Sequence, residues 1–180
     1  MHVSGILIKK VETCVEKLLA CGKKVTFAES CTGGLLAFLF SSVPDASKVF
    51  FGSVVTYMDD AKIKLLNIPA EIIETHGAAS EKVADEMAFR ALEAMRPLGI
   101  DIAVSITGFA GSNTSNMRNE GDGTTTTNEE RTGDVYIGLA TRSGTRTVYP
   151  HKFNPHSKRY EIQARAAEEA IDIILAEIGR

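Results

Sequence analysis

The chain has 180 residues, of which 44% are hydrophobic and 24% are charged, and its formal net charge is −3. This composition fits one soluble domain over residues 1–180 and excludes long disorder and collagen-like repeats. No apolar run reaches the roughly 18–20 residues of a membrane helix, so we expect no association with a membrane. The acidic charge balance disfavours binding to nucleic acid, so we expect no nucleic-acid partner. Three cysteines without a CxxC pair disfavour a disulfide framework or a cysteine-based zinc site and indicate a cytoplasmic protein.

The first half of the chain predicts helices that alternate with strands. Apolar residues recur at helical spacing in the first segment, and short β-branched or aromatic runs follow between glycines and prolines. Pro69 is expected to end the last unit, and His76-Gly77 to form a turn. The predicted elements are a helix over 4–21, a strand over 23–28, a helix over 35–40, a strand over 50–57 and a helix that begins at Asp59.

The second half predicts one more alternation and then a hairpin. A helix over 81–95 follows Ser80, which is a good N-cap, and a strand over 100–106 comes next. Residues 112–133 are polar and without pattern, which predicts a long loop inside the domain. Strands over 134–141 and 145–153 and a helix over 157–178 complete the chain. This order predicts an α/β fold: a three-layer α/β/α sandwich around a mixed, mostly parallel sheet of about five strands.

The segment Glu29–Gly34 joins a predicted strand to a predicted helix. Gly33 and Gly34 permit a tight turn, and free N–H groups at a helix start attract an anion or a developing oxyanion. Ser30 or Cys31 in this turn could be a nucleophile, and Thr32 could contact the substrate. The alternative is an N-capping hydroxyl with glycines for packing.

Lys62 lies just after a predicted strand that ends in Tyr57. As a general base it would have to be neutral, which burial or a neighbouring cation could bring about by lowering its pKa. The alternative is an ordinary lysine in water. Spacing alone makes Tyr57 a core residue at the end of its strand.

The segment Thr107–Gly111 follows another predicted strand. Thr107, Gly108, Ala110 and Gly111 are small enough to bring backbone N–H groups to a substrate, or they form an ordinary turn. The four histidines form no tight ligand pair, so no metal and no other cofactor is expected.

Several blocks together resemble the C-terminal domain of the competence/damage-inducible protein CinA, the nicotinamide-nucleotide amidase family. The resemblance runs from about Ile6 to Leu175, and its AESCTGG block is specific. The blocks are AESCTGG at 28–34, GSVVTY at 52–57 with Ala61-Lys62, HGAASE at 76–81, TGFAG at 107–111 and VYIGLA at 135–140.

The resemblance implies hydrolysis of nicotinamide mononucleotide to nicotinate mononucleotide and ammonia. Ser30 matches the family nucleophile, and Tyr57 and Lys62 match its activating residues. Backbone N–H groups of Cys31–Gly34 would hold the oxyanion, and the phosphate would sit against a helix N-terminus or Thr107–Gly111, with or without an arginine. The family also implies a homo-oligomer.

The chain departs from the family at loops that would face the substrate. Met58-Asp59 stand where the family has Ser-Asn, Ser112 replaces a proline, and Arg131-Thr132-Gly133 replace Lys-Pro-Val-Gly. Lys158-Arg159 follow Ser157 where the family has Gly-Asp-Arg, and Gln163 stands where it has a further Arg. A non-catalytic nucleotide-binding member and a Cys31 nucleophile therefore stay open as alternatives. The loop over 112–133 is expected to act as a lid or to reach a neighbouring subunit.

Overall fold

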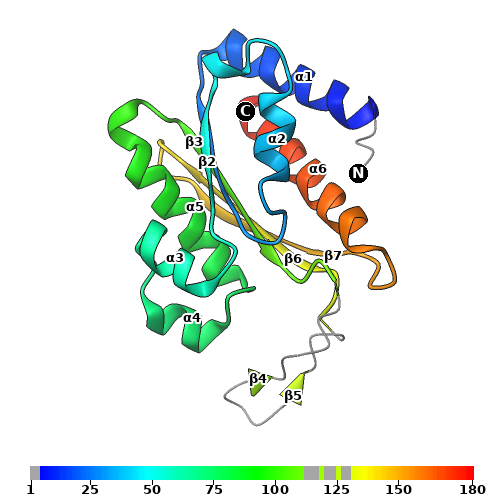
Figure 1. Ribbon diagram of the computed structural model, residues 1–180. Helices are drawn as coiled ribbons and strands as arrows, with labels where there is room; N and C mark the ends of the chain where they lie inside the picture. The colour runs from blue at the N-terminus through cyan, green and yellow to red at the C-terminus, as the bar shows by residue number, and fades with distance from the viewer. Residues whose placement is uncertain (1–4, 112–117, 120–124, 127–130) are drawn as a thin grey trace.

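The fold is taken from a computed structural model that describes residues 5–111, 118–119, 125–126 and 131–180. At its centre is a sheet with the strand order β2-β1-β3-β6-β7 (Figure 1). Strand β1 (Val25–Glu29) pairs in parallel with β2 (Phe50–Val55) and with β3 (Ile102–Gly108). Strand β6 (Asp134–Thr141) is antiparallel both to β3 and to β7 (Arg146–Lys152). Four strands of this sheet therefore point in one direction, and β6 points in the other.

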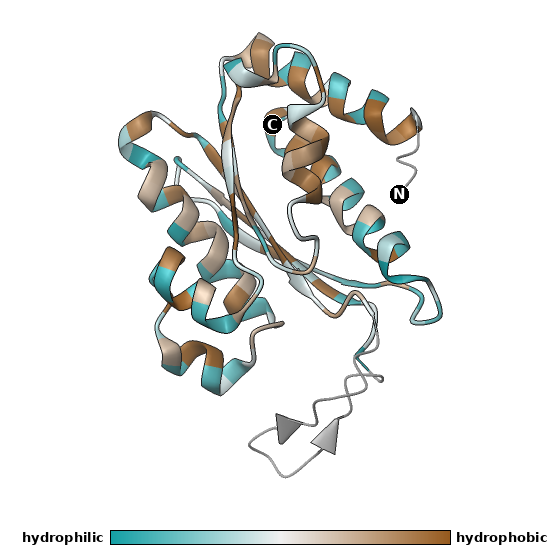
Figure 2. Cartoon of the chain, in the orientation of Figure 1, coloured by the Kyte–Doolittle hydropathy of each residue, from teal (hydrophilic) through white to brown (hydrophobic). Residues whose placement is uncertain are grey.

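Helices cover both faces of the sheet, as predicted. The helices α1 (Gly5–Cys21), α2 (Leu35–Ser41) and α6 (Arg159–Ile178) lie on one face (Figure 1). The other face carries α3 (Asp59–Leu66), α4 (Ala70–His76) and α5 (Glu81–Met95). Hydrophobic and hydrophilic residues alternate around α1 and α6, whereas α2 is hydrophobic almost throughout (Figure 2). The predicted three-layer α/β/α class with a mixed sheet is confirmed.

Each face of the sheet has its own apolar core. Phe27 of β1 packs with Phe40 and Phe50 on the α2 side, at ring-centroid distances of 4.8 and 4.9 Å. On the α5 side, Ala28 and Ala103 of the sheet join Met87 in the second core. Because successive side chains of a strand point to opposite faces, β1 contributes to both cores and is buried along its whole length.

The element prediction missed three helical segments that the structure describes. Helix α4 was missed, because Pro69 seemed to end a unit; it precedes the first turn of α4 instead, where the missing N–H of a proline costs nothing. Two short 3-10 helices, Ala46–Lys48 and Arg96–Leu98, were also not predicted.

The polar segment 112–133 is only partly described. Within it, β4 (Arg118–Asn119) pairs antiparallel with β5 (Thr125–Thr126), in a stretch where no strand was predicted. The lid prediction concerns residues 112–117, 120–124 and 127–130, which lie outside the described residues.

The sheet register places three strand ends side by side. Glu29 is paired with Val55 of β2 and with Ile106 of β3. The residues that follow, Ser30 and Thr56, stay in this register: Ser30 N–H donates to Ile106 O, and Thr56 N–H donates to Glu29 O. The carboxyl ends of parallel strands are where ligands bind in sheets of this kind, so this edge is the place to look for a site.

Candidate active site

Ser30 stands at the first position after β1, in a sharp turn. Its N–H is held by Ile106 O at 2.9 Å, and its own carbonyl accepts from Gly33 N–H at 3.0 Å. Gly33 and Gly34 have φ values of 61° and 97°, which residues with a Cβ atom rarely adopt. The two glycines are therefore required by the turn that carries Ser30.

Glu29 organises this turn, and sequence reasoning missed it. Its side chain is fully buried, and its carboxylate accepts five hydrogen bonds. The donors are Thr32 Oγ1 at 2.8 Å, Ala37 N–H at 2.9 Å, and Gly34 N–H, Leu36 N–H and Ser53 Oγ at 3.1 Å each. The anion expected at the helix start is thus an internal carboxylate. An acidic residue at the end of a buried strand is the signal that could have identified it.

The predicted base, Lys62, is buried. Its side chain is 1% exposed, which contradicts the alternative of a lysine in water. The Nζ atom lies 3.2 Å from Ser30 Oγ and 3.1 Å from the carbonyl oxygen of Thr56. Asp59 Oδ1 is 3.9 Å from the same Nζ. Removal from water favours the neutral amine, whereas the Asp59 carboxylate favours the ammonium.

Tyr57 is not the core residue that its spacing suggested. Strand β2 ends at Val55, and Tyr57 is 52% exposed. Its hydroxyl accepts a hydrogen bond of 2.7 Å from Arg159 Nη2 of α6. Arg159 also packs against Gly111, where an added Cβ would lie 3.3 Å from Arg159 Cβ. Tyr57 and Arg159 therefore lie together at the rim, next to the Thr107–Gly111 segment.

The Thr107–Gly111 segment is held in place by contacts with neighbouring parts of the chain. Thr107 Oγ1 donates to Ala78 O at 2.8 Å, and Ala110 is buried. Gly108 lies so close to the backbone of Asp134 and Val135 that a Cβ would clash with both. Phe109 stacks under the Arg131 guanidinium at 4.6 Å. Gly108 is therefore needed for close packing against β6, and contact of the segment with a substrate stays a prediction.

Cys31 is buried beside Ser30, and its chemistry differs from that of an activated thiol. Burial raises the pKa of the Cys31 thiol to about 12, although Arg159 and Lys62 act in the opposite direction. A reactive thiol needs a lowered pKa, so the arrangement disfavours Cys31 as the nucleophile. Cys14 is buried, as predicted for a packing residue, whereas Cys21 is exposed, and its Sγ lies 3.5 Å from Leu18 O.

The backbone N–H groups of the turn differ in what they bond. Those of Gly33 and Gly34 are engaged, by Ser30 O and by Glu29. Within the residues that the structure describes, the N–H groups of Cys31 and Thr32 bond no oxygen atom. Gln163 of α6 donates from Nε2 to Cys31 O at 2.8 Å, a contact that sequence reasoning did not find.

In the described ranges, no three His, Cys, Asp or Glu side chains lie close enough together to hold a metal ion. No helix among those same residues is both long and apolar enough to cross a membrane.

Comparison with known proteins matches almost the whole chain. The model of the CinA C-terminal domain family matches residues 8–178. A CinA-like protein of Chlorobaculum tepidum is 38% identical over 169 residues, which cover 93% of this chain and 37% of that protein. A CinA-like protein of Prochlorococcus marinus subsp. pastoris is 36% identical over 162 residues, covering 90% and 33%. The chain thus spans about a third of the length of these curated relatives.

Solved structures of other proteins share the fold of this chain. The competence/damage inducible protein CihA from Agrobacterium tumefaciens matches with a TM-score of 0.84 at 27% identity, over 100% of this chain and 99% of that one. A competence-damaged protein (CinA) superfamily protein from Klebsiella pneumoniae matches with a TM-score of 0.81 at 28% identity, over 96% and 98%. With the family match over residues 8–178, these similarities show that the chain belongs to the CinA C-terminal domain family.

Proposed function

We propose that this protein is an amidohydrolase in which Ser30 is the nucleophile and Lys62 is the general base. The observation that carries the proposal is the distance of 3.2 Å between Lys62 Nζ and Ser30 Oγ, with the lysine side chain buried. A nucleophile and a base within hydrogen-bond reach are the minimum that covalent acyl transfer needs. Burial supports the base role, because the neutral amine is the form that can accept the proton of Ser30.

The reaction follows from this pair. Ser30 Oγ bonds to the amide carbon while its proton passes to Lys62 Nζ, and the carbonyl oxygen becomes an oxyanion. The oxyanion then collapses and the carbon–nitrogen bond breaks, while the Lys62 ammonium gives its proton to the leaving nitrogen, which departs as ammonia. Water next attacks the acyl-enzyme and loses a proton to Lys62, which returns a proton to Ser30. Atoms and charges balance without a cofactor.

The oxyanion would be held by the turn itself. The N–H groups of Cys31 and Thr32 are the candidates, since those of Gly33 and Gly34 already have acceptors. One such donor contributes about 3–4 kcal/mol to transition-state binding in known enzymes. This narrows the predicted donors from four residues to two.

For the substrate, we propose the carboxamide of nicotinamide mononucleotide, which the family resemblance implies. Arg159 supports a phosphorylated substrate, because it places a cation at the rim beside Gly111 and Tyr57. In this proposal Tyr57 helps to activate Ser30 from the rim of the site, where its hydroxyl accepts a hydrogen bond from Arg159. A homo-oligomer remains a prediction of the resemblance.

The test is ammonia release from a panel of pyridine nucleotides that includes nicotinamide mononucleotide. We expect wild-type turnover and a loss of at least about 1,000-fold in kcat for Ser30→Ala and for Lys62→Met. Ser41→Ala and Lys64→Met change an exposed residue of the same type on α2 and on α3, and should keep kcat within about twofold. Full activity of Ser30→Ala would contradict the proposal.

The departures at Met58 and Asp59 favour a second candidate, a nucleotide-binding member without turnover. Met58 is largely exposed directly after Tyr57, and Asp59 places a carboxylate 3.9 Å from Lys62 Nζ. Calorimetry separates the two candidates. Heat of binding for the nucleotide without any ammonia release would support the second and remove the first.

A further inference from the structure

Gln163 makes a contact that links two parts of the chain far apart in sequence. Its side chain leaves the second turn of α6, and Nε2 donates to the carbonyl oxygen of Cys31 at 2.8 Å. The accepting carbonyl belongs to the residue directly after Ser30. The contact therefore ends on the turn that carries the proposed nucleophile.

The bonded carbonyl shares a peptide plane with the N–H of Thr32. The C=O of one residue and the N–H of the next lie in one rigid planar unit and, in a trans peptide, point in opposite directions. Fixing Cys31 O therefore fixes the direction of Thr32 N–H. A donor on the carbonyl also polarises the peptide and strengthens its N–H as a donor.

The Thr32 N–H is otherwise uncommitted. The side chain of Thr32 is held in place, because its Oγ1 donates to Glu29 Oε2 at 2.8 Å. The N–H itself bonds no oxygen among the described residues. The peptide is thus fixed through its carbonyl and its neighbouring side chain, while its one donor stays available for a ligand.

Packing of α6 does not account for this contact. The helix is already anchored on the sheet by a row of buried apolar residues, and Gln163 is only partly buried. The row comprises Ile162, Ala166, Ala167, Ala170, Ile171, Ile173 and Ile174. The hydrogen bond is a single partly buried contact beside this apolar row, so its specific consequence is the direction of the peptide that it holds.

We infer that Gln163 is a positioning residue that directs the Thr32 N–H to the oxyanion formed when Ser30 attacks the amide. The inference rests on the proposed function and deepens it. It also assigns a purpose to a departure from the family, which carries an arginine at this place. Glutamine keeps an N–H donor for the Cys31 carbonyl without adding a second cation near Arg159.

Three substitutions test this role in the full chain. Gln163→Leu removes the donor at similar size, Gln163→Glu replaces it with an acceptor that faces the Cys31 carbonyl, and Gln163→Arg restores a donor. We expect kcat for nicotinamide mononucleotide to fall about 10- to 100-fold in Gln163→Leu, with KM within about threefold, because the oxyanion exists only in the transition state. Gln163→Glu should lose at least as much, and Gln163→Arg should recover kcat to within about threefold of wild type.

Arg165→Leu is the matched control, because Arg165 is an exposed residue on the same helix. It should keep both kcat and KM. Thermal unfolding accompanies each assay, and the Tm of Gln163→Leu should stay within a few degrees of wild type. If that variant fails to fold, Gln163→Glu provides the same kinetic comparison at an unchanged side-chain size.

The outcomes distinguish the two claims. An active wild type with an unchanged kcat in Gln163→Leu and Gln163→Glu overturns the positioning role and leaves the amidase proposal standing. A loss that Gln163→Arg does not recover, or one that appears in KM alone, also overturns it. A wild type that releases no ammonia from any nucleotide of the panel removes both claims.

Discussion

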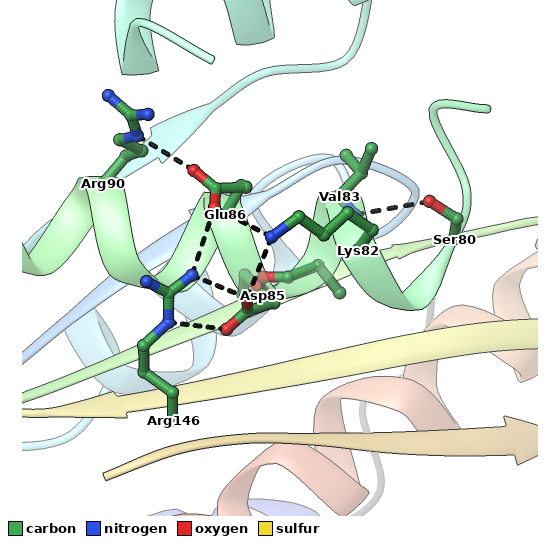
Figure 3. A network of polar contacts seen from close by, with 9 residues as sticks. Ser80, Lys82, Val83, Asp85, Glu86, Arg90 and Arg146 are labelled. Carbon is green, nitrogen blue, oxygen red and sulfur yellow. Dashed lines mark hydrogen bonds and ion pairs between the residues drawn. The ribbon is translucent and has the colours of Figure 1, made fainter. Parts of the chain in front are cut away.

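Two buried carboxylates, Glu29 and Glu86, are stabilised in opposite ways. Glu29 accepts only from neutral donors, which are three backbone N–H groups and two hydroxyls. Glu86 of α5 accepts from three cationic side chains, Lys82, Arg90 and Arg146 (Figure 3). The neutral donors to Glu29 come from the adjacent turn, from the start of α2 and from Ser53 of β2, so they fix the backbone around Ser30. Of the cations at Glu86, Lys82 and Arg90 lie on α5 itself, and Arg146 connects α5 to the edge strand β7.

The network around Glu86 is a clamp between α5 and β7. Arg146 of β7 reaches both Asp85 oxygens, at 2.9 and 2.6 Å, and lies over the Phe89 ring at 4.0 Å. Figure 3 shows the arginine directed from the strand to the acidic side chains of the helix. Burial alone would raise the pKa of Glu86, but hydrogen bonds from Arg90, Arg146 and Lys82 outweigh it and lower that pKa. The clamp therefore depends on charge, whereas the turn at Glu29 depends on the direction of neutral donors.

The largest effect is expected for Glu29→Gln. One carboxylate oxygen becomes an NH₂ group that faces existing donors, so at least one buried backbone N–H loses its acceptor and the charge is removed. We expect the free energy of unfolding to fall by about 3 kcal/mol or more, measured by urea denaturation. Glu16→Gln on the exposed side of α1 is the control and should change stability by less than about 0.5 kcal/mol. A Glu29→Gln protein as stable as wild type would show that the turn does not need this carboxylate.

A smaller, pH-dependent effect is expected for Glu86→Gln. At pH 7 the substitution should cost about 2 kcal/mol, because three charge-assisted hydrogen bonds are weakened. The pKa of Glu86 is lowered from 4.5 in the folded protein, so its contribution is present above that value and is lost as the pH falls through the folded pKa. The free energies of unfolding of wild type and variant, measured by urea denaturation, should therefore converge as the pH falls below about 4.5. A stability difference that is the same at pH 7 and pH 3 would contradict the charge-based account.

Arg146→Lys should cost about 1 kcal/mol of unfolding free energy. Lysine keeps the charge but loses both the two-point contact with Asp85 and the flat stacking on Phe89. Arg142→Lys is the matched control, since Arg142 is half-exposed and lies 3.9 Å from Asp101. An equal change in the two variants would show that the planar contact adds nothing to stability.

The smallest effect is expected on the buried thiols. With a pKa of about 12, Cys31 is thiolate to only about one part in 10,000 at pH 8, and Cys14 has the same pKa. Iodoacetamide should therefore label the exposed Cys21 in the folded protein and all three cysteines after denaturation. Peptide mass spectrometry measures this. Rapid native labelling of Cys31 would reopen its role as a nucleophile.

Local sequence predicted the strand, turn and helix around Ser30, because a short apolar strand and two adjacent glycines lie within ten residues. It could not show that Lys62 is buried, since that depends on how α3 packs after β2. Tyr57 was misjudged for a similar reason: the strand ends two residues before it, and its partner Arg159 lies on the last helix. The contact from Gln163 to Cys31 spans 132 positions and follows only from the packed fold. The site roles themselves stay predictions.

The most direct measurement is the kcat for ammonia release by wild type, Ser30→Ala and Cys31→Ala on nicotinamide mononucleotide. The two variants remove neighbouring candidates for the same chemical step, so each serves as the control of the other. The proposed mechanism predicts a loss of at least about 1,000-fold in Ser30→Ala and less than about tenfold in Cys31→Ala. Retained activity in Ser30→Ala, or the larger loss in Cys31→Ala, would contradict it.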